Sequence, residues 1–154
     1  MDVGLVNPFL AATLDILQKV AGLTSEVQKP FLKTEQEGRG AVSGVVAVKG
    51  KIPGTAAITF SKKCILSVVS TMFGENITEV NDEVRDAVGE ITNMISGLVT
   101  QLYEKGGLGL KAGLDQVLMG DRHRIPHLPH QPVLGIPVKT DKGEITIELC
   151  FKET

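Results

Sequence analysis

The feature that most constrains the fold is one long segment, residues 82–104, in which apolar residues recur with the period of an α-helix. At about 100° per residue they share one stripe, roughly 80° wide: Val84, Val88, Ile91, Ile95, Leu98 and Leu102. Asn81 is a candidate N-cap, and Asp82 and Glu83 lie near the positive end of the helix dipole. We therefore expect a long helix that buries this stripe in the core.

Two β-rich segments supply the hairpins of a sheet. "GAVSGVVAVKGKIPGTAAITFS" (40–61) turns around Gly50–Lys51, and "PVLGIPVKTDKGEITIELCFKE" (132–153) turns at 141–143. Further short strands are expected in "EVQKPFLKT" (26–34), where Pro30 favours a sheet edge, and in "DQVLMGD" (115–121), after the turn-rich "GGLGLKAGL" (106–114).

Two more helices are predicted. Residues 6–21 have an apolar side, with Asn7–Pro8 as cap and first turn and Gly22 at the end, and residues 61–73 form a shorter helix closed by Gly74. The fold class is therefore α/β, with long helices packed on a central, largely antiparallel sheet.

A loose internal repeat runs through this pattern, because helix, short strand and hairpin occur in residues 6–60 and again in 82–151. When "DILQKVAGL" (15–23) is laid on "EITNMISGL" (90–98), Asp15 falls on Glu90 and Gln18 on Asn93, while Ala11 falls on Asp86. Two amphipathic helices can align this well by chance, so a duplication and a coincidence both stay open.

The totals describe an ordinary globular chain. Its 154 residues suit a single domain, 1–154, and the net charge of −2 points neither to nucleic acid nor to an anionic membrane. Cys64 and Cys150 lie in apolar settings without a CxxC pair, which indicates buried free thiols in a reducing compartment. The N-terminus lacks signal-peptide features and no apolar run reaches the length of a membrane span, so we expect a cytoplasmic protein.

The long helix carries a second, polar stripe on its other side. Asp86, Glu90, Asn93 and Gly97 follow spacings of i, i+4, i+7 and i+11 and fall within roughly 60° of one another. A solvated face is the simplest interpretation. Against it, Asn is a poor helix former, Gly89 and Gly97 each cost about 1 kcal/mol relative to Ala, and no Lys or Arg on the stripe pairs with the acids.

The residue types on this stripe suit one kind of chemistry. Asn93 cannot titrate, but its amide can hold a water through donated and accepted hydrogen bonds, and Glu90 is a fixed anion. Such groups can position a water against an electrophile that is already reactive, as in phosphoryl transfer. The site has no cation for the phosphate, so a partner protein would bring its own Mg²⁺ and lysine.

The pattern Asp86-x₃-Glu90-x₂-Asn93-x₃-Gly97 resembles the signature of the CheC/CheX/FliY chemotaxis phosphatases. The opening "NPFLAATLDIL" segment, the first hairpin and "MFGE" before the helix resemble CheX over nearly the whole chain. CheC-like relatives carry two copies of the signature and a proline well downstream of the Asn, which are missing here, so the resemblance favours CheX.

The resemblance implies a function. CheX-like proteins hydrolyse the aspartyl phosphate of the response regulator CheY; accordingly Asn93 would orient the attacking water and Glu90 would engage the receiver lysine. Asp86 and Gly97 would contact the partner. The protein would need no cofactor of its own, since the receiver supplies Mg²⁺, and it would form a homodimer.

Two other functions remain open at this stage. A CheX-like module could dock on a receiver or flagellar switch protein without turnover. Alternatively, the histidine loop could make this a metal- or small-molecule-binding domain. His123, His127 and His130 in "RHRIPHLPH", with Asp121, could bind zinc, although their spacing matches no known motif and a flexible, solvated loop is the simpler interpretation. "GKIPGT" and "GGLGLKAG" hint at phosphate loops but lack the required ending and context.

Overall fold

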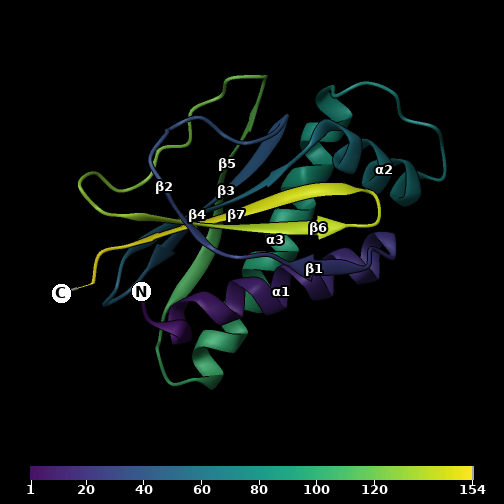
Figure 1. The fold of residues 1–154 in the computed structure, drawn as a ribbon. Helices are drawn as coiled ribbons and strands as arrows, with labels where there is room; N and C mark the ends of the chain where they lie inside the picture. Colours follow the sequence, from purple (N-terminus) through teal and green to yellow (C-terminus); the bar gives the residue numbers. More distant parts are fainter. Residues whose placement is uncertain (154) are drawn as a thin grey trace.

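The computed structural model describes residues 1–153, which form three helices and seven strands (Figure 1). The elements are α1 (Val3–Ala21), β1 (Ser25–Val27), β2 (Phe31–Lys33), β3 (Val42–Lys49), β4 (Gly54–Phe60), α2 (Lys62–Phe73), α3 (Asp82–Lys105), β5 (Lys111–Met119), β6 (Val133–Thr140) and β7 (Gly143–Phe151).

The seven strands form one sheet in which every pairing is antiparallel, in the order β1-β6-β7-β4-β3-β5. β2 also pairs with β6, so β1 and β2 share one edge and β5 forms the other. The hairpins β3–β4 and β6–β7 meet through β4 and β7 at the centre. β1, from the first half of the chain, pairs with β6 of the second hairpin, and β5, from the second half, pairs with β3 of the first hairpin. The strand order is therefore symmetric about the β7–β4 pair. The predicted antiparallel sheet is confirmed.

All three helices pack on one face of this sheet, where the main core lies. The predicted apolar stripe of α3 faces this core: Val84, Val88, Ile91 and Ile95 are fully buried, and Leu98 and Leu102 are partly buried against it. The caps also follow the prediction, because Asn81 Oδ1 accepts from the Val84 N–H at 3.1 Å and Gly74 ends α2 in the left-handed conformation.

The predicted start of the first helix is wrong. α1 begins at Val3, where the Asp2 carboxylate accepts from the Gly4 N–H at 2.7 Å, and Pro8 lies inside the helix rather than in its first turn. The proline removes one backbone hydrogen bond, but Leu5 and Phe9 are buried in the core and hold this part of the helix in place.

α1 also corrects the expectation about membrane spans, since it is long and apolar enough to cross a membrane by length and composition alone. The helix contains only two charged residues, Asp15 and Lys19, so its mean hydropathy remains as high as that of a membrane-spanning helix. In this fold the apolar side of α1 packs on α3 and the sheet.

Two strand predictions need correction. The segment expected as one short strand at 26–34 is split into β1 and β2 by residues 28–30, with Pro30 at the sheet edge as predicted. The strand expected at 115–121 begins earlier, at Lys111, because pairing with β3 extends it through residues that resemble a turn in sequence.

Two close contacts fix α3 in position. Gly44 on β3 lies directly beneath Thr92, and a Cβ at Gly44 would overlap the Thr92 hydroxyl. Near the C-terminal end of α3, the Tyr103 hydroxyl donates to the Leu5 carbonyl of α1 at 2.7 Å, and the Tyr103 ring packs edge-on against Phe9. α3 is therefore held against both the sheet and α1, and the side of α3 that faces neither of them is free.

Candidate functional site on the exposed side of the long helix

α3 presents the predicted polar stripe to solvent. Asp86, Glu90, Asn93 and Gly97 are all exposed, on the side of the helix away from its buried stripe. Glu90 and Asn93 are one turn apart, about 4.5 Å along the helix axis. A regular helix thus holds the carboxylate and the amide side by side, with their relative position set by the backbone.

The polar side chains of the stripe have no partner within residues 1–153. The side chains of Asp86, Glu90 and Asn93 make none of the hydrogen bonds or ion pairs found in this part of the chain. Elsewhere, an exposed carboxylate with a base four residues on does form an ion pair, as in Asp15–Lys19 at 2.9 Å. The stripe is therefore available to another molecule.

A hollow of about 510 Å³ extends the stripe toward the sheet edge. Its walls come from α3 and from β5, and it is lined by Arg85, Asp86, Gly89, Glu90, Asn93, Leu114 and Val117. The register of β3 and β5 shifts between Val45 and Val46, so Asp115 is an extra residue in β5. This β-bulge lets Leu114 and Val117 both face α3.

The two helix glycines differ in their surroundings. A Cβ at Gly97 would meet nothing within 4 Å, which agrees with the expectation of an open surface there. A Cβ at Gly89 would lie 3.8 Å from both Leu114 and Val117, so this half-buried glycine forms part of the floor of the hollow.

Sequence reasoning missed Arg85. It lies about 100° away from Asp86 around the helix, outside the stripe as predicted. Because β5 runs alongside that side of α3, Arg85 nevertheless lines the same hollow as Glu90 and Asn93. The helix alone could not give this result, since the other wall of the hollow belongs to β5, which begins at Lys111, 26 residues after Arg85.

α1 does not reproduce the stripe of α3. Asp15, which the alignment places on Glu90, is tied to Lys19 in an ion pair. Gln18 is exposed, and Ala11 stands where α3 has Asp86. The α1 surface thus lacks the free carboxylates that distinguish α3.

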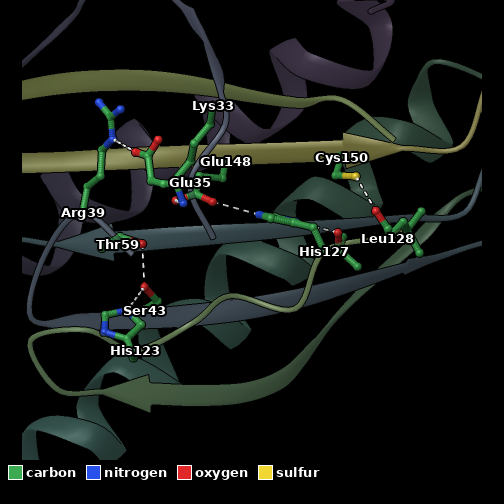
Figure 2. Close-up of polar contacts among 11 residues, drawn as sticks. Lys33, Glu35, Arg39, Ser43, Thr59, His123, His127, Leu128, Glu148 and Cys150 are labelled. Carbon is green, nitrogen blue, oxygen red and sulfur yellow. Dashed lines mark hydrogen bonds and ion pairs between the residues drawn. The ribbon is translucent and has the colours of Figure 1, made fainter. Parts of the chain in front are cut away.

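The histidine loop is not the flexible, solvated loop expected from its sequence. His123 contacts the Ser43 hydroxyl at 2.6 Å and the Gly120 carbonyl at 2.7 Å. His127 contacts Glu148 at 2.9 Å (Figure 2) and the Thr55 hydroxyl at 2.7 Å. His130 is exposed. His123 and His127 thus contact different strands on the second face of the sheet, the face opposite the helices. Residues 1–153 contain no group of three His, Cys, Asp or Glu placed to hold a metal ion.

This second face contains a buried ionic cluster that the sequence did not reveal. The Lys33 Nζ atom lies 2.8 Å from Glu148 Oε2, and the two side chains are 1% and 0% exposed. Glu148 also contacts His127 through its other carboxylate oxygen, as Figure 2 shows. The cluster fastens β2 and the histidine loop to β7, on the opposite face of the sheet from α3.

The remaining sequence hints have structural roles. "GKIPGT" is the connection between β3 and β4, and "GGLGLKAG" leads from the end of α3 into β5. Neither joins a strand to a helix, the context that a phosphate-binding loop requires. Cys64 and Cys150 are buried free thiols, as expected.

Comparison with known proteins agrees with this fold. The family model described as chemotaxis phosphatase CheX matches residues 42–139, which include all of α3. A relative from Thermotoga maritima named CheY-P phosphatase CheX is 27% identical over 108 residues, 70% of each chain.

Two solved structures are similar over almost their whole length. Chemotaxis protein CheX from Desulfovibrio desulfuricans is 37% identical with a TM-score of 0.86, over 96% of this chain and 99% of that one. A chain of the CheX–CheY–BeF₃–Mg²⁺ complex from Borrelia burgdorferi is 21% identical with a TM-score of 0.74, over 96% and 97% of the two chains, and shows a likeness of fold.

Proposed function

The chain belongs to the CheX family of chemotaxis phosphatases, and from this premise we propose that it hydrolyses the aspartyl phosphate of a CheY-type receiver. The observation that carries the proposal is the pair Glu90 and Asn93, exposed, unpaired within residues 1–153 and adjacent on a rigid helix of this fold. The Thermotoga maritima relative is named for the same activity.

In the proposed mechanism, Asn93 positions the attacking water. Its amide oxygen accepts a hydrogen bond from the water and its NH₂ group can donate to a phosphoryl oxygen, which fixes the water in line with phosphorus. The Asn93 amide is not a nucleophile and Glu90 is occupied by the receiver lysine, so in this mechanism the water attacks phosphorus directly and the bond from phosphorus to the receiver aspartate breaks. No covalent intermediate forms on this chain, and the rate enhancement comes from positioning and electrostatics.

Glu90 sets the register of the complex. Its free carboxylate pairs with the lysine of the receiver's active site, one helical turn from Asn93, and so places the phosphoryl group opposite the amide. Asp86 and Gly97 extend the contact to either side along α3. Mg²⁺ comes with the phosphorylated receiver and neutralises the phosphate charge; the Borrelia burgdorferi complex likewise contains CheY, BeF₃ and Mg²⁺.

We also propose the domain organisation, the cellular location and the oligomeric state of the protein. We expect one domain, 1–154, working in the cytoplasm as a homodimer. β5 pairs with β3 on one side and, within residues 1–153, with no strand on the other, so its free backbone groups could accept a strand from a second copy. Light scattering of the purified protein would measure the dimer directly.

The test is phosphate release from a phosphorylated CheY-type receiver with Mg²⁺. We expect Asn93→Ala to lower kcat by about a hundredfold or more while receiver binding stays near wild type, because the lost group acts on the water. Glu90→Lys should abolish both binding and turnover through like charge against the receiver lysine.

Glu79→Lys provides the matched control, since it makes the same charge reversal at an exposed residue outside the stripe. If Asn93→Ala and Glu90→Lys both keep full activity, the assignment of the active site to α3 is wrong.

A docking module without turnover is the second candidate, and the same assay separates the two. Such a module would bind the receiver through Glu90 and show no hydrolysis that depends on Asn93. The phosphatase is favoured because the amide that would position the water is present beside the docking carboxylate, and free.

A further inference from the structure

Arg85 is the one basic residue that lines the hollow between α3 and β5. Its side chain is exposed and forms none of the ion pairs found within residues 1–153, although Asp82 and Asp86 are close to it in sequence. Four residues further along the helix, where a carboxylate would pair with it, stands Gly89. The guanidinium is therefore free at the edge of the candidate active site.

Arg85 lies in a part of α3 whose exposed side chains are otherwise acidic. Asp82, Glu83, Asp86 and Glu90 are all exposed in the first three turns, and Arg85 is the only base among them. A phosphorylated receiver presents a phosphoryl group and the carboxylates that hold Mg²⁺, so it is also acidic around its phosphorylation site. Two acidic surfaces repel each other, and the receiver lysine that meets Glu90 relieves this at one point only.

From these observations we propose that Arg85 is a specificity-determining residue, whose guanidinium pairs with a carboxylate at the rim of the receiver's phosphorylation site. This inference rests on the proposed function. Arg85 and Glu90 would form two contacts of opposite sign, so that a receiver must offer a carboxylate and a lysine at the matching separation. Arg is suited to this task, because its planar fork binds a carboxylate through two hydrogen bonds.

The geometry assigns Arg85 to recognition and not to the chemical step. Eight residues separate it from Asn93, or about 12 Å along the helix axis. Side chains on a helix lean toward its N-terminus, so the Arg85 side chain leans away from Asn93 and from a phosphoryl group held opposite it.

The experiment compares wild type, Arg85→Gln and Arg85→Lys in steady-state hydrolysis of the phosphorylated receiver, at low and high salt. Arg85→Gln should raise KM about tenfold and leave kcat within about twofold, since one charge-assisted pair is lost before the chemical step. KM should also depend less steeply on salt in this variant. Arg85→Lys keeps the positive charge but cannot form the two parallel hydrogen bonds of a guanidinium, so its KM should lie between those of wild type and Arg85→Gln.

Two controls isolate the contact. Arg122→Gln removes an exposed arginine from the loop after β5, outside the hollow, and should leave KM and kcat unchanged. Titration of each variant with a receiver activated by beryllofluoride and Mg²⁺ measures binding without turnover, and Kd should rise about tenfold for Arg85→Gln alone.

These measurements separate the inference from the proposed function. If wild type hydrolyses the receiver and Arg85→Gln changes neither KM nor Kd by more than twofold, Arg85 is outside the contact and the inference fails. A lower kcat at unchanged KM also overturns it, because Arg85 would then act on the reacting group. If wild type binds the activated receiver but does not hydrolyse the phosphorylated one, the proposed phosphatase fails while the Kd comparison still tests Arg85.

Discussion

Replacing Gly97 by larger residues should make the protein more stable and less active at the same time. Gly97 lies in the interior of α3, where a glycine costs about 1 kcal/mol relative to alanine. A Cβ there would meet nothing within 4 Å, so the gain in helix stability is not offset by a clash. Gly97→Ala should therefore raise the free energy of unfolding by about 1 kcal/mol, and Gly97→Leu by slightly less. For a chain of this size, Tm should rise by about 2–4 °C.

The same substitutions should weaken docking in order of size. If the receiver packs against Gly97 in the proposed complex, an alanine methyl group adds a small protrusion, while leucine adds four carbons and separates the surfaces. We expect a modest rise in KM for Gly97→Ala and a rise of tenfold or more for Gly97→Leu, equivalent to about 1.4 kcal/mol of lost binding.

Denaturant unfolding and the phosphate-release assay, run on the same preparations, measure the two effects. Ala11→Leu adds a leucine to an exposed position of α1 and controls for the presence of a new apolar side chain on a helix surface. Normal activity in Gly97→Leu would place Gly97 outside the contact. A loss of stability in Gly97→Ala would refute the open environment on which the reasoning depends.

Two further predictions concern the second face of the sheet and the thiols. Glu148→Ala leaves the Lys33 ammonium buried without its partner and should lower the free energy of unfolding, measured with denaturant, by about 3–5 kcal/mol. As a control, Glu90→Gln at an exposed position should change it by about 0.5 kcal/mol or less. A decrease below about 1 kcal/mol for Glu148→Ala would contradict a buried charge at Lys33. Burial raises the pKa of the Cys64 thiol from 9.0 to about 11, so the unfolded chain releases this proton first and stability should fall as pH rises from about 9 to 11, by up to about 1.4 kcal/mol per pH unit; Cys64→Ala should show a shallower fall, and equal slopes would show that the thiol is not responsible.

The sequence predicted α3 well because several independent signals agree there. The apolar period, the Asn81 cap and the acidic first turn all come from residues within or next to the segment, and each acts locally. The same is true of the two hairpins, whose turns lie close to the predicted positions. A polar stripe opposite an apolar one could likewise be located from helix geometry alone.

The errors arise where contacts distant in sequence decide the structure. Lys111 and Ala112, which resemble part of a turn in sequence, form the start of β5 because they pair with Lys49 and Val48 of β3. The proline-rich histidine loop resembles a solvated connection, yet Thr55 and Glu148 bind His127 from strands that the sequence does not place beneath it. Glu148 lies in the alternating "ITIELC", which places it on the face of the strand opposite Ile145 and Ile147, and nothing in that pattern shows that this face is buried.

The position of the candidate site on a helix has a mechanistic consequence. Thr92, the residue before Asn93, packs onto the bare backbone of Gly44 and donates its hydroxyl to the Val88 carbonyl at 2.7 Å, so α3 is anchored immediately beneath the amide. The backbone positions of Glu90 and Asn93 then keep their separation whether or not a receiver is present. In the proposed reaction the helix is therefore preorganised, and the entropy cost falls on ordering the two exposed side chains and on the docking of two proteins. That cost is why recognition at the edges of the stripe, by Arg85 on one side and Gly97 on the other, should control KM far more than kcat.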